Sequence, residues 1–91
     1  MNPMIRILLV DDHPLVRDGV SMRLQATDHI RVVGEAASVD QALPLARELS
    51  PDLVVTDIRM PGASGIDLAA LFRDQFPLVR VLVLSMHEDP E

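Results

Sequence analysis

Short runs of apolar residues alternate along the chain with longer segments in which apolar residues recur every three or four positions. The short runs are rich in valine, isoleucine and leucine, and they predict strands at residues 5–10, 30–36, 53–56 and 80–84. The first run is apolar at nearly every position, which is typical of a strand buried on both faces of a parallel sheet. The second run alternates polar and apolar residues, so we expect it to have one more exposed face.

Three helices are predicted between these strands, at residues 14–25, 39–49 and 65–75. Pro14 suits a first helical turn, because the N–H group that proline lacks would have no partner there. Ser38 and Gln41 form a capping-box pair before the second helix, and Ser64 is a candidate cap for the third. Pro44 lies inside the second helix, where it is expected to kink the first turns or tighten the start.

Strict alternation of strand and helix predicts an open parallel sheet with right-handed crossovers and helices on both faces. In such folds, ligands bind beyond the carboxyl ends of the strands. Asp11 and Asp12 follow the first strand, and Asp57 follows the third. Ser85 follows the fourth strand, whereas the second ends in two alanines. The polar chemistry is therefore expected to gather at one edge of the sheet.

Composition narrows the possible functions. Ninety-one residues are enough for one domain, and 48% hydrophobic residues argue against intrinsic disorder. The absence of cysteine excludes disulfides, thiolate zinc sites and a cysteine nucleophile. A net charge of −6 and the presence of only two aromatic residues, both phenylalanine, argue against a nucleic-acid-binding surface. All eight basic residues are arginines, so this chain supplies no lysine ammonium.

The apolar runs are too short to form a signal peptide or to span a membrane. We therefore expect a cytoplasmic domain that makes no membrane contact.

Three carboxylates at one edge of a sheet repel one another unless a cation lies among them. A hard divalent ion with oxygen ligands is the expected occupant, and Mg²⁺ keeps several waters beside a few carboxylates. Zinc is less favoured, because it prefers histidine and cysteine ligands, and we expect His13 and His87 to be solvated at the rim rather than to bind metal. A carboxylate beside Mg²⁺ can act as a nucleophile and form an acyl phosphate, and the Ser85 hydroxyl could donate to a phosphoryl oxygen.

These residues carry a family resemblance. The pair Asp11-Asp12, the motif DIRMPGASGID from Asp57 to Asp67, and Ser85 occur in this order along the whole chain. In this the chain resembles the receiver domain of two-component response regulators. The stretches DDHPLVRDGV and SMHEDPE resemble the FixJ/LuxR-type transcriptional regulators in particular. The resemblance implies a flavodoxin-like fold with strand order 2-1-3-4-5.

The resemblance implies a role for each matching residue of the acidic group. Asp57 would accept a phosphoryl group from a histidine kinase. Asp12 would bind Mg²⁺ directly, and Asp11 would bind it mainly through water. The backbone carbonyl of Arg59 would be a further metal ligand, and Asp57 would contact the same ion.

The resemblance also implies a switch and a rim, and it shows where the chain departs from the family. Ser85 would be the hydroxyl that turns toward the phosphoryl group, and the Arg59 and His87 side chains would tune dephosphorylation. The family has a lysine that pairs with the phosphoryl group, but this chain contains none and no arginine can be assigned to its place. We therefore expect Mg²⁺ to bind, and phosphorylation to be slow or short-lived.

Compared with the family, residues 1–91 correspond to the first three quarters of a receiver domain. The fold is thus an incomplete open sheet of four strands and three helices, which stops before a fourth helix and before any DNA-binding output domain. A natural truncation and a fragment of a longer protein both remain open. In either case the fourth strand becomes an apolar edge. We expect self-association, as a homodimer or by exchange of elements between chains.

The leading hypothesis is a phosphoacceptor signalling module of a transcriptional regulator, which phosphorylates itself and is not a conventional enzyme. The alternative is an interaction or dimerisation module that no longer switches, which the missing lysine and later helices favour. A nucleotide-binding enzyme is disfavoured because the chain has neither a G-x-G-x-x-G nor a G-x-x-x-x-G-K motif.

Overall fold

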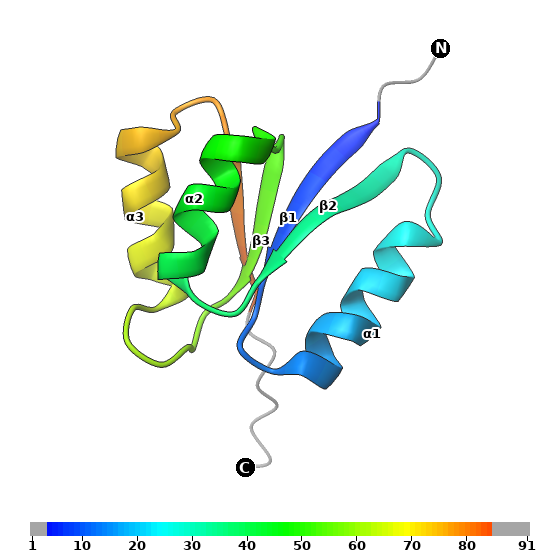
Figure 1. Ribbon diagram of the computed structural model, residues 1–91, viewed down its shortest axis with the longest axis horizontal. Helices are drawn as coiled ribbons and strands as arrows, with labels where there is room; N and C mark the ends of the chain where they lie inside the picture. The colour runs from blue at the N-terminus through cyan, green and yellow to red at the C-terminus, as the bar shows by residue number, and fades with distance from the viewer. Residues whose placement is uncertain (1–3, 85–91) are drawn as a thin grey trace.

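The computed structural model describes residues 4–84, which form one four-stranded parallel sheet with three helices. The chain alternates strand and helix without exception, and the strand order in the sheet is β2-β1-β3-β4 (Figure 1). The elements are β1 (Ile5–Val10), α1 (Pro14–Gln25), β2 (Ile30–Ala36), α2 (Val39–Leu49), β3 (Leu53–Asp57), α3 (Gly65–Gln75) and β4 (Arg80–Leu84). The predicted elements and the predicted strand order are confirmed over this part of the chain.

Strand β1 lies inside the sheet and pairs with β2 on one side and β3 on the other. Its last four residues are buried, as the uniformly apolar sequence predicts. Strand β4 pairs with β3, and Leu84 lies opposite Asp57 in the register. Because every strand runs in the same direction, the ends of β1 and β3 reach the same edge of the sheet. This edge carries the acidic residues.

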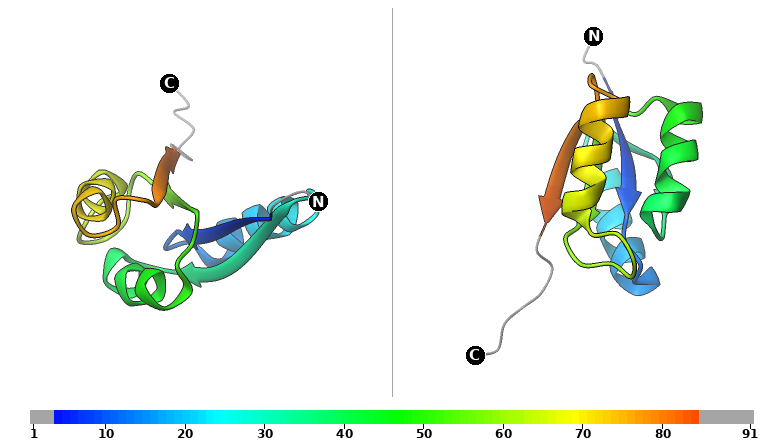
Figure 2. Two further views of the ribbon diagram at one scale, coloured as in Figure 1. Left: turned by 90° about the horizontal axis from the view of Figure 1, so that it is seen from above. Right: turned by 90° about the vertical axis from the view of Figure 1, so that its left-hand side faces the viewer.

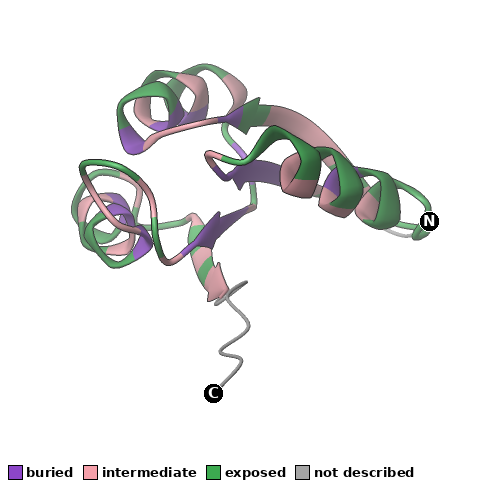
Figure 3. Cartoon of the chain, turned by 90° about the horizontal axis from the view of Figure 1, so that it is seen from below, coloured by how far each residue is buried: buried purple, intermediate pink, exposed green. Residues whose placement is uncertain are grey.

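The helices cover the two faces of the sheet unequally (Figures 1 and 2). Helices α2 and α3 pack on one face around a buried cluster that contains Leu8, Val54 and Phe72. On the other face, Ile7, Leu9 and Val55 form a smaller cluster, against which α1 contributes two partly buried side chains. Figure 3 shows that burial is concentrated in the middle strands and decreases toward β4. The core therefore lies mainly between the sheet and the helix pair α2–α3.

The helix starts follow the capping residues in the sequence. At α3, the Ser64 side chain accepts a hydrogen bond from the Asp67 N–H and the Asp67 carboxylate accepts one from the Ser64 N–H, which completes a capping box. At α2, Ser38 accepts from the Gln41 N–H, but Gln41 Oε1 accepts from the Ala37 N–H, one residue before the cap. The reciprocal half of the predicted capping box is thus displaced by one residue.

Helix α2 continues through Pro44 to Leu49, so the proline does not end it. Beyond Leu49, the backbone of Ser50 turns into the left-handed region with φ of 49°. That turn directs the chain toward Pro51, which is buried at the start of the return to the sheet.

Gly65 is the residue that allows α3 to begin directly against the end of β3. Its N–H donates to the carbonyl of Ile58 at 3.0 Å, and the residue is buried. A Cβ atom at this position would overlap the backbone carbonyl oxygen of Asp57. Gly65, the second glycine of the MPGASG motif, therefore allows two backbone segments to pack closely beside the acidic edge.

We predict that Gly65→Ala destabilises the fold by about 2–3 kcal/mol, because a rigid backbone oxygen has to move to admit the new methyl group. Gly19→Ala is the matched control. It adds a methyl group inside α1, where nothing lies within 4 Å, and should stabilise by about 0.5–1 kcal/mol. Urea denaturation followed by far-ultraviolet circular dichroism measures both changes, since the chain has no tryptophan or tyrosine. Equal stability of the two variants would contradict the role given to Gly65.

Candidate metal centre

The β1–α1 loop and the end of β3 bring four potential ligand side chains together. One ligand atom from each of Asp11, Asp12, His13 and Asp57 lies within 4.8 Å of the others. Asp11 and Asp57 are nearly enclosed, with 4% and 9% of their surfaces exposed. The three carboxylates predicted from the strand ends therefore do converge. The imidazole of His13 joins them, which the sequence analysis did not anticipate.

Asp11 is fixed by backbone hydrogen bonds on both sides. Its N–H donates to the carbonyl of Ala36 at 3.0 Å, which extends the pairing of β1 with β2 by one residue. Its carboxylate Oδ1 accepts the N–H of His13 at 2.8 Å, a local turn that aspartate favours. This carboxylate therefore has a defined orientation before any ligand arrives.

Asp12 presents an oxygen that protein groups leave unsatisfied. Its Oδ1 atom is buried and has no hydrogen-bond partner within the described part of the chain. The Nδ1 atom of His13 lies 3.0 Å away, without the alignment of a hydrogen bond. A buried acceptor of this kind costs free energy unless a positive group satisfies it. The atom thus marks the place where a cation would be most strongly stabilised.

Arg17 anchors the β1–α1 loop to β2, a role that sequence reasoning missed. Its Nη1 donates to the backbone carbonyl of Asp11 at 2.6 Å, and its Nε lies 3.2 Å from Oε1 of Glu35 on β2. Only 19% of the side chain is exposed. In the helical pattern of residues 14–25, Arg17 lies off the apolar stripe, and such a position predicts a side chain exposed to solvent. Its contact with Asp11 depends on how α1 packs on the sheet, which the helical pattern alone does not reveal.

The remaining predicted site residues are placed less completely. Arg59 is exposed, two residues beyond Asp57, and the role of its backbone carbonyl as a metal ligand stays a prediction. Ser85 and His87 lie outside the described residues, so the switch hydroxyl and the histidine of the rim stay predictions as well. Ser85 follows Leu84 in the sequence, and Leu84 pairs with Asp57.

The donor set fits a hard divalent cation. Three carboxylates supply anionic oxygen ligands in one cluster, and within residues 4–84 one buried oxygen, Asp12 Oδ1, accepts no hydrogen bond. Oxygen-rich sites of this kind suit Mg²⁺, which retains water at its remaining positions. Asp11, Asp12 and Asp57 are the residues that would hold it.

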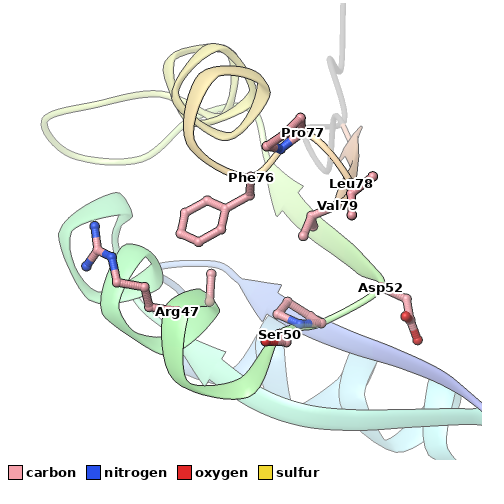
Figure 4. A pocket seen from close by; sticks show the side chains of 9 residues that line it. Arg47, Ser50, Asp52, Phe76, Pro77, Leu78 and Val79 are labelled. Carbon is pink, nitrogen blue, oxygen red and sulfur yellow. The ribbon is translucent and has the colours of Figure 1, made fainter.

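A second concavity lies at the opposite end of β3, away from the carboxylates. This cavity of about 450 Å³ opens between the end of α2 and the segment that follows α3. The Phe76 ring projects from the end of α3 toward α2, and the Arg47 guanidinium carbon lies 6.0 Å from its centre (Figure 4). Asp52 borders the cavity, but its carboxylate already accepts the N–H of Arg6 at 2.9 Å. Among residues 4–84, the side chains that line this cavity form no cluster of potential metal ligands, whereas those at the acidic edge do. The acidic edge is therefore the candidate site.

An open parallel sheet with helices on both faces and an acidic group beyond β1 and β3 defines the class of protein: a flavodoxin-like α/β domain with its site at the carboxyl edge. Residues 7–91 match the family model of the response regulator receiver domain. The chain therefore belongs to the response regulator receiver domain family, as the sequence motifs predicted. Receiver domains of this family are signalling modules.

Individual relatives agree with this assignment. Transcriptional regulatory protein MctR of Rhizobium johnstonii is 47% identical over 89 residues, which cover 98% of this chain and 42% of MctR. A LuxR-family response regulator from Aurantimonas sp. has a TM-score of 0.87 at 40% identity, covering 93% of this chain and 61% of that one. The isolated receiver domain of RcsB from Salmonella enterica has a TM-score of 0.85 at 29% identity, covering 96% and 65%.

The chain spans about two fifths of the length of MctR and of the related response regulators named GacA. The branch predicted from the sequence is confirmed, because these relatives are response regulators of the LuxR and NarL type. Within residues 4–84, no helix is long and apolar enough to cross a membrane.

We predict that Mg²⁺ raises the melting temperature of the chain and that Asp12→Asn removes most of this rise. At about ten times its Kd, the ion should stabilise the fold by about 1.4 kcal/mol, which corresponds to roughly 6–11 °C in a domain of this size. Without metal, Asp12→Asn should itself be more stable by about 1 kcal/mol, because one of three neighbouring negative charges is gone. Thermal denaturation with and without Mg²⁺ measures both effects.

Asp74→Asn is the control, since it removes the same charge from an exposed position on α3. It should keep the full Mg²⁺ response. A response of Asp12→Asn as large as that of the unaltered chain would contradict the assignment of the metal centre.

Proposed function

We propose that this chain is the phosphoacceptor module of a two-component transcriptional regulator, with Asp57 as the acceptor and Mg²⁺ as the cofactor. The observation that carries the proposal is the convergence of Asp11, Asp12 and Asp57 beyond the sheet, where one buried carboxylate oxygen accepts no hydrogen bond from the described part of the chain. Membership of the receiver family supports the same reading. The related protein RcsB of Salmonella has been solved in the presence of the phosphomimetic BeF₃⁻.

In the proposed reaction, a carboxylate oxygen of Asp57 attacks the phosphorus of a phosphohistidine on a histidine kinase. The O–P bond forms while the N–P bond breaks, and the electron pair returns to the imidazole, which takes a proton. Asp11 and Asp12 would hold Mg²⁺, which when bound would neutralise charge on the phosphoryl oxygens. The hydrogen bond from the His13 N–H fixes the direction of Asp11. Gly65 keeps α3 close against the backbone of Asp57.

Further roles in the proposal come from the family. The Arg59 carbonyl completes the metal ligands, Ser85 serves as the switch hydroxyl, and the Arg59 and His87 side chains tune dephosphorylation at the rim. The proposal takes residues 1–91 as the first three quarters of a receiver domain within a longer regulator. Contact with DNA would then belong to a separate output domain, and the module would act in the cytoplasm. The similarity to MctR, a transcriptional regulatory protein, supports this setting.

The chain contains no lysine to pair with the phosphoryl group. A preorganised cation near the developing charge is a large part of the stabilisation in such sites. Within the 91-residue chain we therefore expect phosphorylation to be slow or short-lived. An interaction module that does not switch is the competing function, and it predicts no phosphorylation at all.

We predict that incubation with a small phosphodonor and Mg²⁺ adds the mass of one phosphoryl group, and that Asp57→Asn abolishes the addition. The amide lacks the anionic oxygen that attacks phosphorus, although its shape is nearly unchanged. Intact-mass spectrometry measures the adduct, and Asp74→Asn serves as the charge-matched control that should still be labelled. If the unaltered chain binds Mg²⁺ but is never labelled, the interaction module is the better description.

We also propose that the 91-residue chain associates with itself through β4. This strand pairs with β3 on one side, and within the described residues no strand pairs with its other side. Leu82 on this strand is 48% exposed. An apolar strand with unpaired backbone groups is a template for a second chain. The related protein RcsB has been solved as dimers bound to DNA, so association occurs in a relative.

We predict that Leu82→Lys shifts the chain from dimers or larger species to monomers, because a charge on the edge strand opposes pairing. Leu78→Lys introduces the same charge at a position that is 94% exposed and precedes β4, so it should leave association unchanged. Size-exclusion chromatography with light scattering distinguishes the species. A compact monomer at high concentration of the unaltered chain would rule out this edge as an interface.

A further inference from the structure

We infer that His13 is a fourth ligand of the metal centre and that its imidazole shifts the preference of the site toward Zn²⁺ and similar borderline ions. The inference rests on the proposed metal centre but goes beyond it, because a site made only of carboxylates and water favours Mg²⁺. The structure places His13 Nδ1 inside the same cluster as the three carboxylates.

The distances match the spacing of ligands around one ion. His13 Nδ1 lies 3.0 Å from Oδ1 of Asp12 and 3.2 Å from Oδ1 of Asp11. Ligands bound at about 2.1 Å lie about 3.0 Å apart in an octahedral arrangement. At about 2.0–2.1 Å in a tetrahedral arrangement, they lie about 3.3 Å apart. Without a metal, the contact between His13 Nδ1 and Asp11 Oδ1 is a hydrogen bond in which the ring donates. Coordination would therefore exchange the Nδ1 proton for the ion, at separations that need little movement of the side chain.

The local backbone explains why the imidazole faces the carboxylates. His13 occupies the N-cap position of α1, but its side chain makes no capping hydrogen bond. Its N–H donates to Asp11 Oδ1, and its carbonyl accepts the N–H of Arg17 at 2.9 Å. The backbone is thus held from both directions, while the ring is not used to start the helix. Its Nδ1 is directed toward the acidic group instead.

The ring can bind metal without losing its contact with water. Coordination through Nδ1 requires the neutral tautomer with its proton on Nε2. The His13 side chain is 63% exposed, so water can accept that N–H group. The neighbouring carboxylates of Asp11 and Asp12 are largely enclosed. The cluster therefore combines buried anionic oxygens with one exposed nitrogen donor.

One nitrogen donor changes the order of metal preference. Imidazole is a good ligand for zinc and other later first-row ions, whereas Mg²⁺ gains little from replacing water with nitrogen. Loss of His13 should therefore weaken Zn²⁺ binding strongly and leave Mg²⁺ binding nearly unchanged. A histidine that only offsets the negative charge of the cluster would instead alter both ions in the same direction.

The test measures Zn²⁺ and Mg²⁺ affinities of the tag-free chain by titration calorimetry, for the unaltered protein and for His13→Asn. Asparagine is a favoured N-cap residue, so the start of α1 is preserved. We expect a loss of at least about 10-fold in Zn²⁺ affinity and a change of less than about 2-fold for Mg²⁺. His29→Asn is the control, since asparagine tolerates the positive φ of 74° at that position. It should leave both affinities unchanged.

Long-range ¹H–¹⁵N correlation spectra of the histidine rings give a direct readout. Zn²⁺ should move the Nδ1 resonance of His13 and leave that of His29 in place. If His13→Asn lowers both affinities equally, or if the His13 ring nitrogens do not respond to Zn²⁺, the inference is wrong while the Mg²⁺ centre stands. If neither ion binds the unaltered chain, the proposed metal centre fails together with the inference.

Discussion

Mutual repulsion of three carboxylates is the constraint on which the acidic edge of this molecule depends. Asp11 and Asp12 directly follow β1, and Asp57 ends the neighbouring strand β3, so the three carboxylates lie in one cluster. Their charges can be accommodated by water, by a cation or by a positively charged ligand. A cation among the three carboxylates would offset their mutual repulsion.

The surrounding structure holds this arrangement through contacts of side chains with the backbone and through one close backbone approach. Arg17 ties the Asp11 carbonyl to Glu35 on β2, so that the first loop is linked to the strand beside β1. Gly65 permits α3 to start against the backbone of Asp57. The capping box of Ser64 fixes the start of the same helix. A change in any of these contacts would displace the carboxylates without altering a single ligand atom.

The two ends of β3 serve different purposes. Its carboxyl end carries the charged cluster, whereas its amino end borders an apolar cavity beside Phe76. The sheet also differs between its two sides, because β1 is enclosed while β4 lies at an edge with partly exposed residues. The acidic cluster, the cavity beside Phe76 and the edge strand β4 are thus different parts of one four-stranded sheet.

The sequence by itself determined the order of elements, the parallel sheet and the three carboxylates at its edge, because hydrophobic period and strand-end position are local properties of the chain. It did not determine that His13 lies 3.0 Å from Asp12, that Arg17 is mostly enclosed, or that Gly65 meets the Asp57 carbonyl. Those contacts join segments through the packing of α1 and α3 on the sheet. Only the tertiary structure decides them, since side-chain direction and backbone separation depend on how whole elements dock.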